Sequence, residues 1–254
     1  MTAHATRRKI LQTGATASLS VLASRAAQDA GRPRRVLAIL GDAYHAAAPL
    51  DRALVGGLRG AGWKAVTIID YAVPWEEFSR FDLIILSREA HEYVRFFRER
   101  DSAPAGKREL WITPAQERKF EEYVTAGGRL FLFHDGFGFY PKGGAVSRLA
   151  KAFFIRHPPI VEIEVSPTGK MPELNRGISP FKVADEEYEV EMDESQTSVY
   201  LESRSPQHGR HAQGWAHPSG KGKVAVLIPG HGTQTISHPM VRRSIQNILE
   251  WLTA

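Results

Sequence analysis

Short apolar runs without polar alternation recur along the chain. Continuous runs of this kind are typical of strands that are covered on both faces, as in a parallel sheet. They predict buried strands at residues 36–41, 64–70, 81–87, 129–133 and 223–228. Segments with helical signals separate most of these runs, and such alternation predicts βαβ units. We therefore expect an α/β domain built on a parallel sheet of at least five strands, with 129–133 in its interior.

The clearest helix signal precedes the run at 129–133. Thr113 is a good N-cap, Pro114 fits the first helical turn, and Gln116 stands at the reciprocal position of a capping box. The pair Gly127-Gly128 then ends this helix. Other helices are expected at residues 49–62, at 145–154 and from Pro239 onwards.

After Val161 the pattern changes from continuous apolar runs to alternation of apolar and polar residues. Alternation with a period of two is typical of half-exposed strands. It predicts short antiparallel strands at 161–165, 188–192 and 198–201. We interpret them as an antiparallel β addition to the sheet rather than as a second domain.

The first thirty residues are expected to be a targeting segment followed by a linker. Arg7 and Arg8 precede a weakly apolar stretch at residues 10–23, a pattern typical of a bacterial twin-arginine signal. Small residues at Ala23 and Ala26 fit a cleavage site. The sequence thus predicts a signal region at 1–30, one folded domain at 31–254, and a periplasmic or extracellular location. A disordered basic tail is the alternative interpretation.

The charge of the chain argues against nucleic acid as a partner. The formal net charge is +5, but Arg7, Arg8, Lys9 and Arg25 all lie in the predicted signal region, which holds no acidic residue before position 27. Removing these four from the 33 basic residues leaves 29 against 28 acidic residues, so the mature protein is near neutral. Beyond the first thirty residues no apolar run is long enough to span a membrane, so we expect no stable membrane insertion.

Several motifs in a fixed order carry a family resemblance. They are a strand ending at His134, then Asp185-Glu186-Glu187-Tyr188, then Trp215-Ala216-His217 before residues 220–224, and finally Gly230-His231. Together, over about residues 36–252, they resemble the trehalose-utilisation (ThuA-like) family. The resemblance implies a flavodoxin-like three-layer fold, with helices on both faces of the parallel sheet. It also implies a role in carbohydrate metabolism, chiefly in the handling of disaccharides and their oxidised keto derivatives.

The resemblance further implies a relation to class I glutamine amidotransferases. Those enzymes place a cysteine nucleophile at the elbow after the central strand, where this chain has His134. The chain contains no cysteine at all. Hydrolysis of glutamine through a thiolate is therefore excluded.

Polar side chains follow the predicted parallel strands, whose carboxyl ends meet at one edge of the sheet. We expect His134, Glu186 and His231 to be catalytic, because histidine paired with a carboxylate transfers protons near neutral pH. The residues expected to bind a small-molecule carbohydrate are Asp42, Tyr44, His45, His91, Asp135, Tyr140, Asp185, Tyr188, Trp215 and His217. His157 precedes two prolines and is expected to be a loop residue outside the site.

Such a site could carry out isomerisation, elimination or hydrolysis, and no cofactor is expected. One alternative is that His134, His231 and an acidic residue bind a divalent metal, although no HxxxH or HExxH spacing supports it. Another is a non-catalytic carbohydrate-binding or interaction module, which would not need proton-transfer residues. The long insertion at 88–112 is interpreted either as a lid or binding loop or as a plain solvated insertion.

Overall fold

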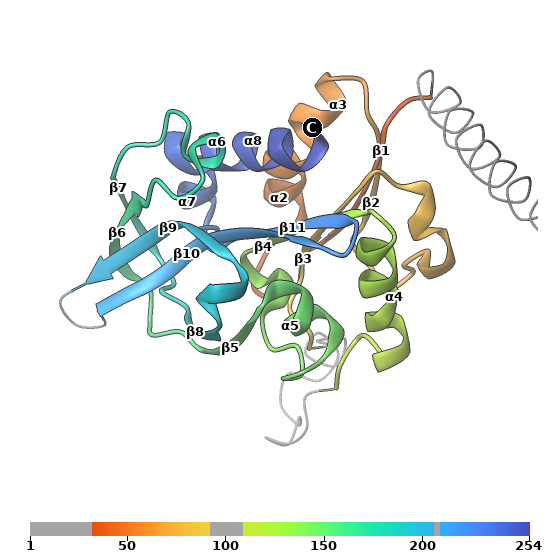
Figure 1. Cartoon of the computed structure of the whole chain (residues 1–254), viewed down its shortest axis with the longest axis horizontal. Helices are drawn as coiled ribbons and strands as arrows, with labels where there is room; N and C mark the ends of the chain where they lie inside the picture. The colour runs from red at the N-terminus through yellow and green to blue at the C-terminus, as the bar shows by residue number, and fades with distance from the viewer. Residues whose placement is uncertain (1–31, 92–108, 206–208) are drawn as a thin grey trace, which may run out of the picture. The chain divides into compact units, whose positions relative to one another are not determined.

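The computed structural model of the chain describes residues 32–91, 109–205 and 209–254, so the predicted signal region and most of the 88–112 insertion lie outside the described residues. Arg35–Ala254 forms one compact unit, distinct from Met1–Arg34. Within it, a large sheet separates two layers of helices (Figure 1). In the described part of the chain, no helix has the length and apolar character needed to cross a membrane.

The five continuous apolar runs form the parallel half of this sheet, as predicted. The strands are β1 (Arg35–Leu40), β2 (Lys64–Ile68), β3 (Leu83–Ser87), β4 (Arg129–Phe133) and β11 (Gly222–Leu227), in the spatial order β2-β1-β3-β4-β11. All four pairings are parallel. The strand β4 lies between β3 and β11, which confirms its predicted place in the interior. The strand order changes direction at β1, since β2 is added on one side of it and β3, β4 and β11 on the other, and ligands of open α/β sheets bind at the carboxyl ends of the strands at such a switch point.

The antiparallel half continues the same sheet beyond β11. Its strands follow in the order β10 (Gly209–Ser219), β9 (Ser198–Ser205), β6 (Val161–Pro167) and β7 (Phe181–Asp185), each antiparallel to its neighbours. The strands predicted near 161–165 and 198–201 are therefore confirmed. The predicted strand at 188–192 corresponds to β8 (Glu189–Met192), which pairs instead with β5 (Ala152–Arg156) in a separate two-stranded sheet.

The strand β10 was not predicted because its sequence is polar and contains glycine. Gln213 is nevertheless fully buried and donates a hydrogen bond to Ser203 on β9. At Gly214, a Cβ would lie 2.6 Å from the ring of Tyr200, so only glycine leaves room for that ring. Tertiary packing, not hydrophobic pattern, thus makes this segment a strand.

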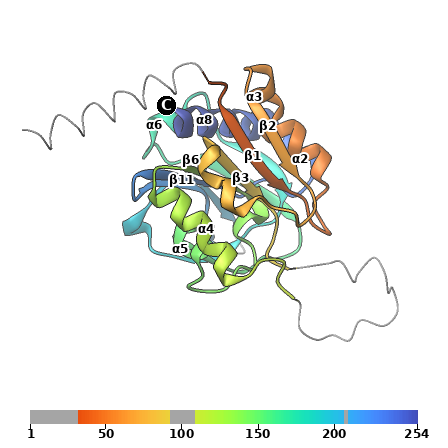
Figure 2. The same ribbon diagram turned by 90° about the vertical axis from the view of Figure 1, so that its right-hand side faces the viewer.

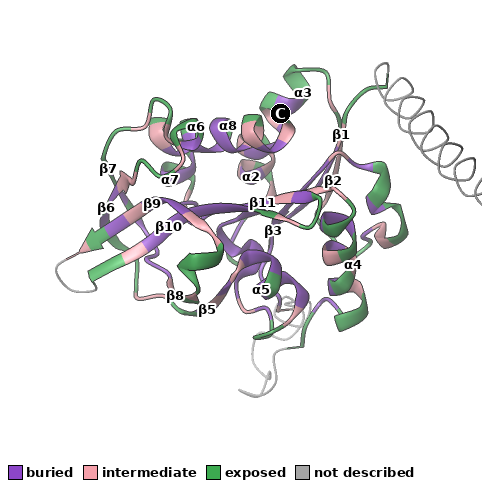
Figure 3. Cartoon of the chain, viewed as in Figure 1, coloured by how far each residue is buried: buried purple, intermediate pink, exposed green. Residues whose placement is uncertain are grey.

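Helices cover both faces of the sheet (Figures 1 and 2). One face carries α2 (Ala47–Leu54), α3 (Gly56–Gly60), α6 (Pro172–Asn175), α7 (Thr233–Ser237) and α8 (Pro239–Thr253). The other carries α4 (Pro114–Thr125), α5 (Ala145–Ala150) and a 3-10 helix, η1 (Trp75–Arg80). Because successive side chains of a strand point to opposite faces, Leu130 and Leu132 belong to one core, and Phe131 and Phe133 to the other. Figure 3 shows buried segments along the strands of the large sheet and on parts of the helices that cover it.

The predicted helix at 145–154 is wrong in its second half. The helix α5 ends at Ala150, where Lys151 adopts a left-handed conformation with φ 55°. The next residues, Ala-Phe-Phe-Ile-Arg, form β5 and pair with β8. Aromatic and β-branched residues favour a strand over a helix wherever a partner strand is present.

The start of α4 matches its predicted capping box. The Thr113 hydroxyl accepts a hydrogen bond from the Gln116 backbone N–H at 3.3 Å, and the Gln116 side chain accepts one from the Thr113 N–H at 2.9 Å. Thr113 is exposed, so its side chain contributes through the cap rather than through packing.

Replacement of Thr113 by Ala therefore removes one cap and should lower the free energy of unfolding by about 1 kcal/mol. For a domain of this size, that corresponds to a fall in Tm of about 2–4 °C. Thermal denaturation followed by circular dichroism measures this change. Thr113→Ser, which keeps the hydroxyl, is the control, and an equal loss of stability in both variants would contradict the assignment.

Candidate functional site

The chain turns abruptly after β4, and His134 stands at this turn. His134 has φ 49°, an unusual value for a residue other than glycine, and it begins the 3-10 helix η2 (His134–Phe137). At Gly136 in the same turn, a Cβ would lie 2.1 Å from the carbonyl oxygen of Leu86 on β3. The turn is thus pressed against the neighbouring strand, and backbone strain of this kind often accompanies a functional residue.

His134, Glu186, His231 and His45 form a cluster at the carboxyl ends of the parallel strands. The Glu186 carboxylate bridges two histidines, with Oε2 3.4 Å from His134 Nε2 and Oε1 3.1 Å from His231 Nδ1. His45 Nε2 lies 3.0 Å from the same His231 Nδ1. The three catalytic residues predicted from the sequence therefore contact one another through Glu186.

The outer nitrogens of two of these histidines are held by acceptors. His134 Nδ1 lies 2.7 Å from the carbonyl oxygen of Ile228, which can only accept, so Nδ1 carries the proton. His45 Nδ1 lies 2.8 Å from Asp42 Oδ1 and 2.5 Å from Asp135 Oδ2, and it donates to these carboxylates. In both residues, Nε2 is left to face the cluster.

Asp185 joins the end of β7 to the loop after β11. Its fully buried carboxylate accepts hydrogen bonds from the backbone N–H groups of Glu186 at 2.7 Å, Gly230 at 3.0 Å and His231 at 3.3 Å. Gly230 also packs closely, since a Cβ there would lie 2.5 Å from the ring of Phe133. Asp185 thus fixes the backbone that carries Glu186 and His231.

Tyr188 and His157 complete one side of the cluster. The Tyr188 hydroxyl donates to Asp135 Oδ1 and lies 3.4 Å from His134 Nε2. The ring of His157 stacks on that of Tyr188, and its Nδ1 lies 3.5 Å from Glu186 Oε1. His157 is a loop residue, as expected, but it lies against the cluster rather than outside the site. It lies after β5, an element that the sequence pattern did not predict.

Burial and charge act against each other on these groups. Burial lowers the pKa of His134, but the charge of Asp135 and the hydrogen bond to Glu186 outweigh it, so the pKa is raised. Burial also lowers the pKa of His45, but the hydrogen bonds and charges of Asp135 and Asp42 together outweigh it and raise the pKa to about 11. Burial raises the pKa of the Glu186 carboxyl, yet hydrogen bonds from His134 and His231 lower it overall. The cluster therefore favours imidazolium groups beside ionised carboxylates.

Two further predicted residues lie at the rim. Tyr44 is 57% exposed and its N–H donates to Asp42. A hollow of about 330 Å³ opens beside His45 and is lined by Asp42, Ile69 and Tyr71 among others. His91 stands at the start of the insertion, and its ring lies 4.8 Å from that of Phe139. Its backbone forms an isolated antiparallel β-bridge with Leu110 at the other end of the insertion. This side of the cluster therefore carries exposed aromatic side chains, Tyr44 and Tyr71.

The structure does not bring the other predicted residues to the cluster. Trp215 is fully buried and its indole N–H donates to the Ala150 carbonyl. The buried Tyr140 hydroxyl donates to the Arg88 carbonyl. His217, on β10, lies at hydrogen-bond distance from the Thr197 hydroxyl and from the Leu149 carbonyl of α5. All three contribute to the packing of the core.

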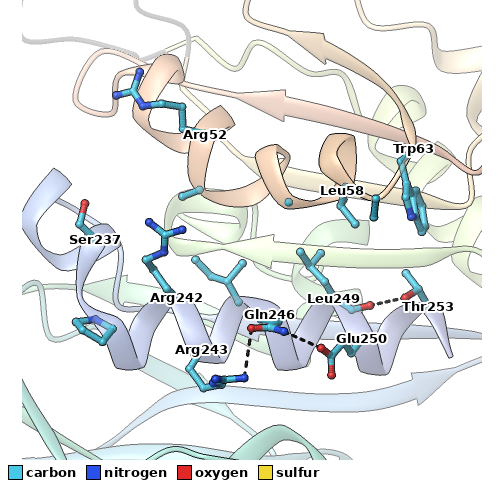
Figure 4. Close-up of a pocket in the computed structure, with 15 residues that line it drawn as sticks. Arg52, Leu58, Trp63, Ser237, Arg242, Arg243, Gln246, Leu249, Glu250 and Thr253 are labelled. Atoms are coloured by element: carbon cyan, nitrogen blue, oxygen red, sulfur yellow. Dashed lines mark hydrogen bonds between the residues drawn. The ribbon is translucent and has the colours of Figure 1, made fainter.

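A second groove, of about 690 Å³, lies between α2, α3 and α8 (Figure 4). Its lining includes Arg52, Trp63, Arg242 and Glu250, but no histidine. It therefore offers no histidine–carboxylate pair of the kind found at the ends of the parallel strands.

The cluster is also a possible metal site. His45, His134, Glu186 and His231 each offer a ligand atom, and all four atoms lie within 4.8 Å of one another. Asp42, His45 and Asp135 form a second such group that shares His45.

Comparison with known proteins gives a consistent picture. Residues 78–252 match the family model described as ThuA, trehalose utilisation. The fold is similar to that of a ThuA-like protein from Parabacteroides merdae (TM-score 0.66, 15% identity, 88% of this chain and 91% of that one). It is similar to a ThuA-like protein from Bacteroides uniformis (TM-score 0.62, 18% identity, 88% and 93%). It is also similar to a Salmonella typhimurium LT2 protein named as cytoplasmic (TM-score 0.60, 14% identity, 87% and 100%). No curated protein sequence matches the chain.

His217 gives a prediction that separates packing from catalysis. Burial, and to a smaller extent the charge of Lys151, lowers the pKa of His217 to about 4, so its side chain is a neutral imidazole in the folded protein. A pKa that is lower in the folded state than the unfolded value of about 6.5 adds stability above that pH, and this stability is lost as the pH falls towards 4.

The unfolding free energy of the unmodified protein should therefore fall as the pH is lowered from 6.5 to 4. In His217→Gln this fall should be smaller by about 1–3 kcal/mol. Urea denaturation at a series of pH values measures this slope. An unchanged slope in the variant would contradict a buried neutral His217.

Proposed function

Because the chain belongs to the ThuA (trehalose utilisation) family, we propose that it acts on a disaccharide or a keto-sugar derivative by histidine–carboxylate proton transfer. The observation that carries this proposal is the position of Glu186, a carboxylate 6% exposed, between His134 and His231. Histidine and carboxylate within hydrogen-bond reach are the usual groups for general acid–base catalysis. Burial strengthens their interaction with charge that develops on a substrate.

A keto group acidifies the neighbouring C–H bond, so a base can remove that proton and leave an enolate. Glu186, ionised between the two histidines, is the group that would accept the proton. An imidazolium in the same cluster stabilises the enolate oxygen by a charge-assisted hydrogen bond. His231, whose side chain is 24% exposed, is the histidine of this group best placed to exchange a proton with solvent.

If the deprotonated carbon carries a hydroxyl, that hydroxyl gives its proton to the enolate oxygen and the abstracted proton returns to the former carbonyl carbon, which moves the keto group and gives isomerisation. Expulsion of a group from the next carbon, with a proton donated to it, gives elimination. Hydrolysis of a glycosidic bond would need a second carboxylate across the bond. Asp135 is already engaged by His45 and Tyr188, so we favour the keto-sugar reactions. Tyr71, which is exposed and lines the hollow, supplies apolar surface for a sugar ring.

His134→Ala should lower turnover by about 100-fold or more, because it removes one partner of the proton-transfer pair. The measurement follows products by NMR after incubation of the purified protein with disaccharides and their keto forms. His238→Asn is the matched control, since His238 lies elsewhere and accepts a hydrogen bond from the Met240 N–H that asparagine can keep.

Sugar binding without turnover, equally tight in the unmodified protein and in His134→Ala, would overturn the enzymatic proposal. It would favour a non-catalytic carbohydrate-binding module in its place. Circular dichroism of each variant establishes that it is folded.

We also propose export through a twin-arginine signal, supported by Arg7 and Arg8 and by the weakly apolar residues 10–23. Replacement of both arginines by lysine should trap the full-length precursor in the cytoplasm of the producing cell. Cell fractionation followed by N-terminal sequencing tests this, with a mature start expected near residue 24 or 27. Unchanged export of the double variant would rule out the twin-arginine route.

A further inference from the structure

We propose that His45, His134, Glu186 and His231 bind one divalent transition-metal ion. The inference concerns the same side chains as the proposed function. With the ion bound they act as ligands, so the ion would polarise the keto group in place of an imidazolium, but metal binding itself does not depend on the substrate. The inference rests on the spacing of the ligand atoms, on the groups that hold the outer nitrogens of the histidines, and on the two contacts shared by His231 Nδ1.

The ligand atoms have the spacing of an inner coordination shell. A zinc ion with bonds of 2.0–2.1 Å in a tetrahedral site holds neighbouring ligand atoms about 3.3 Å apart. Here His45 Nε2 and His231 Nδ1 are 3.0 Å apart, His231 Nδ1 and Glu186 Oε1 3.1 Å, and Glu186 Oε2 and His134 Nε2 3.4 Å. All four atoms lie within 4.8 Å of one another, so small rotations of the side chains bring them to a common centre.

The surrounding groups orient the histidines as ligands. Metal-binding histidines usually donate their second N–H to a carboxylate or a backbone carbonyl. His134 does so to Ile228 through Nδ1, and His45 does so to Asp42 and Asp135. Each therefore directs Nε2 at the cluster, where it can bind an ion that displaces its proton, while Asp185 fixes the backbone of His231.

His231 Nδ1 lies within hydrogen-bond distance of two partners at once. It is 3.0 Å from His45 Nε2 and 3.1 Å from Glu186 Oε1. One nitrogen cannot both accept a hydrogen bond from His45 Nε2 and donate one to Glu186, so hydrogen bonding alone satisfies only one of these contacts. A cation between them satisfies both nitrogens and the carboxylate together.

The ligand types select the ion. Three imidazoles and one carboxylate suit zinc, iron(II) or manganese, and are a poor match for calcium, which prefers oxygen ligands. The overlapping group Asp42, His45 and Asp135 is a weaker candidate. Asp42 Oδ1 and Asp135 Oδ2 already lie 2.8 and 2.5 Å from His45 Nδ1, at hydrogen-bond distance from its proton. These two carboxylates therefore orient His45 rather than bind the ion themselves.

Such an ion would act as a Lewis acid on a carbonyl oxygen. The Tyr188 hydroxyl and the His157 ring are not ligands in this arrangement. They lie beside His134 and Glu186, where they can donate hydrogen bonds or exchange protons with a bound substrate.

The test is direct metal binding by the full chain, without any sugar. Protein treated with a chelator and then desalted is titrated with zinc chloride in a calorimeter, and the bound zinc is measured by elemental analysis. We expect one zinc ion per chain and a rise in Tm on zinc addition. His231→Ala should weaken binding by at least about 100-fold and abolish the rise in Tm, because it removes a ligand. Asp135→Asn, in the outer shell, should weaken it by about 10–100-fold.

His238→Asn should bind zinc as the unmodified protein does. If His231→Ala does not fold, the isosteric Glu186→Gln takes its place. Absence of saturable zinc binding by folded protein, or equal affinity in the unmodified protein and the ligand variant, would overturn the inference. Zinc binding without turnover of any keto sugar would support the metal site while refuting the proposed substrate, so the two proposals fail separately.

Discussion

The site depends on one buried carboxylate, Glu186, and on the histidines that make its burial possible. An ionised carboxylate removed from water is costly unless charged or hydrogen-bonding partners replace the solvent. His134 and His231 supply those partners at 3.4 and 3.1 Å. Because each partner is itself buried or half-buried, removing one would leave an uncompensated charge. Stability and reactivity at this place are therefore coupled.

The fold assembles the cluster from four separate segments. His45 follows β1, His134 follows β4 and His231 follows β11, all at the carboxyl ends of parallel strands. Glu186 arrives from the other direction, after β7 at the far edge of the antiparallel half. Asp185 connects the two parts of the site, because its carboxylate accepts hydrogen bonds from the backbone N–H groups of Glu186 and of Gly230 in the loop after β11. The antiparallel addition is thus required to deliver the carboxylate to the parallel edge.

The turn after β4 sets the position of the imidazole. His134 occupies this elbow in the strained conformation φ 49°. Gly136 and Gly230 keep the backbones of β3 and β11 close to the elbow, because a Cβ at either would clash. A rigid turn that presents an imidazole favours proton transfer or metal binding over attack by a thiolate.

The sequence alone determined the parallel half of the fold. Residues 129–133 and 223–228 carry continuous apolar runs, and such runs are stable only when a sheet is covered on both faces. It also pointed to His134, Glu186 and His231, since two of these residues end buried strands and the third belongs to a recognisable motif. Local pattern suffices there because burial and chain direction follow from the residues themselves.

Only the tertiary structure decided the rest. The strand β10 is polar and contains glycine, so its sequence does not predict a strand. Gly214 lies within it because the Tyr200 ring packs against this position and leaves no room for a Cβ. Trp215 and His217 carry the chemistry of a site but are core residues, since their polar atoms bind the carbonyls of Ala150 and Leu149. His157 lies against Glu186 because β5 pairs with β8 and carries it there. Contacts between segments far apart in the chain depend on where strands pair, and no local spacing of residues records that.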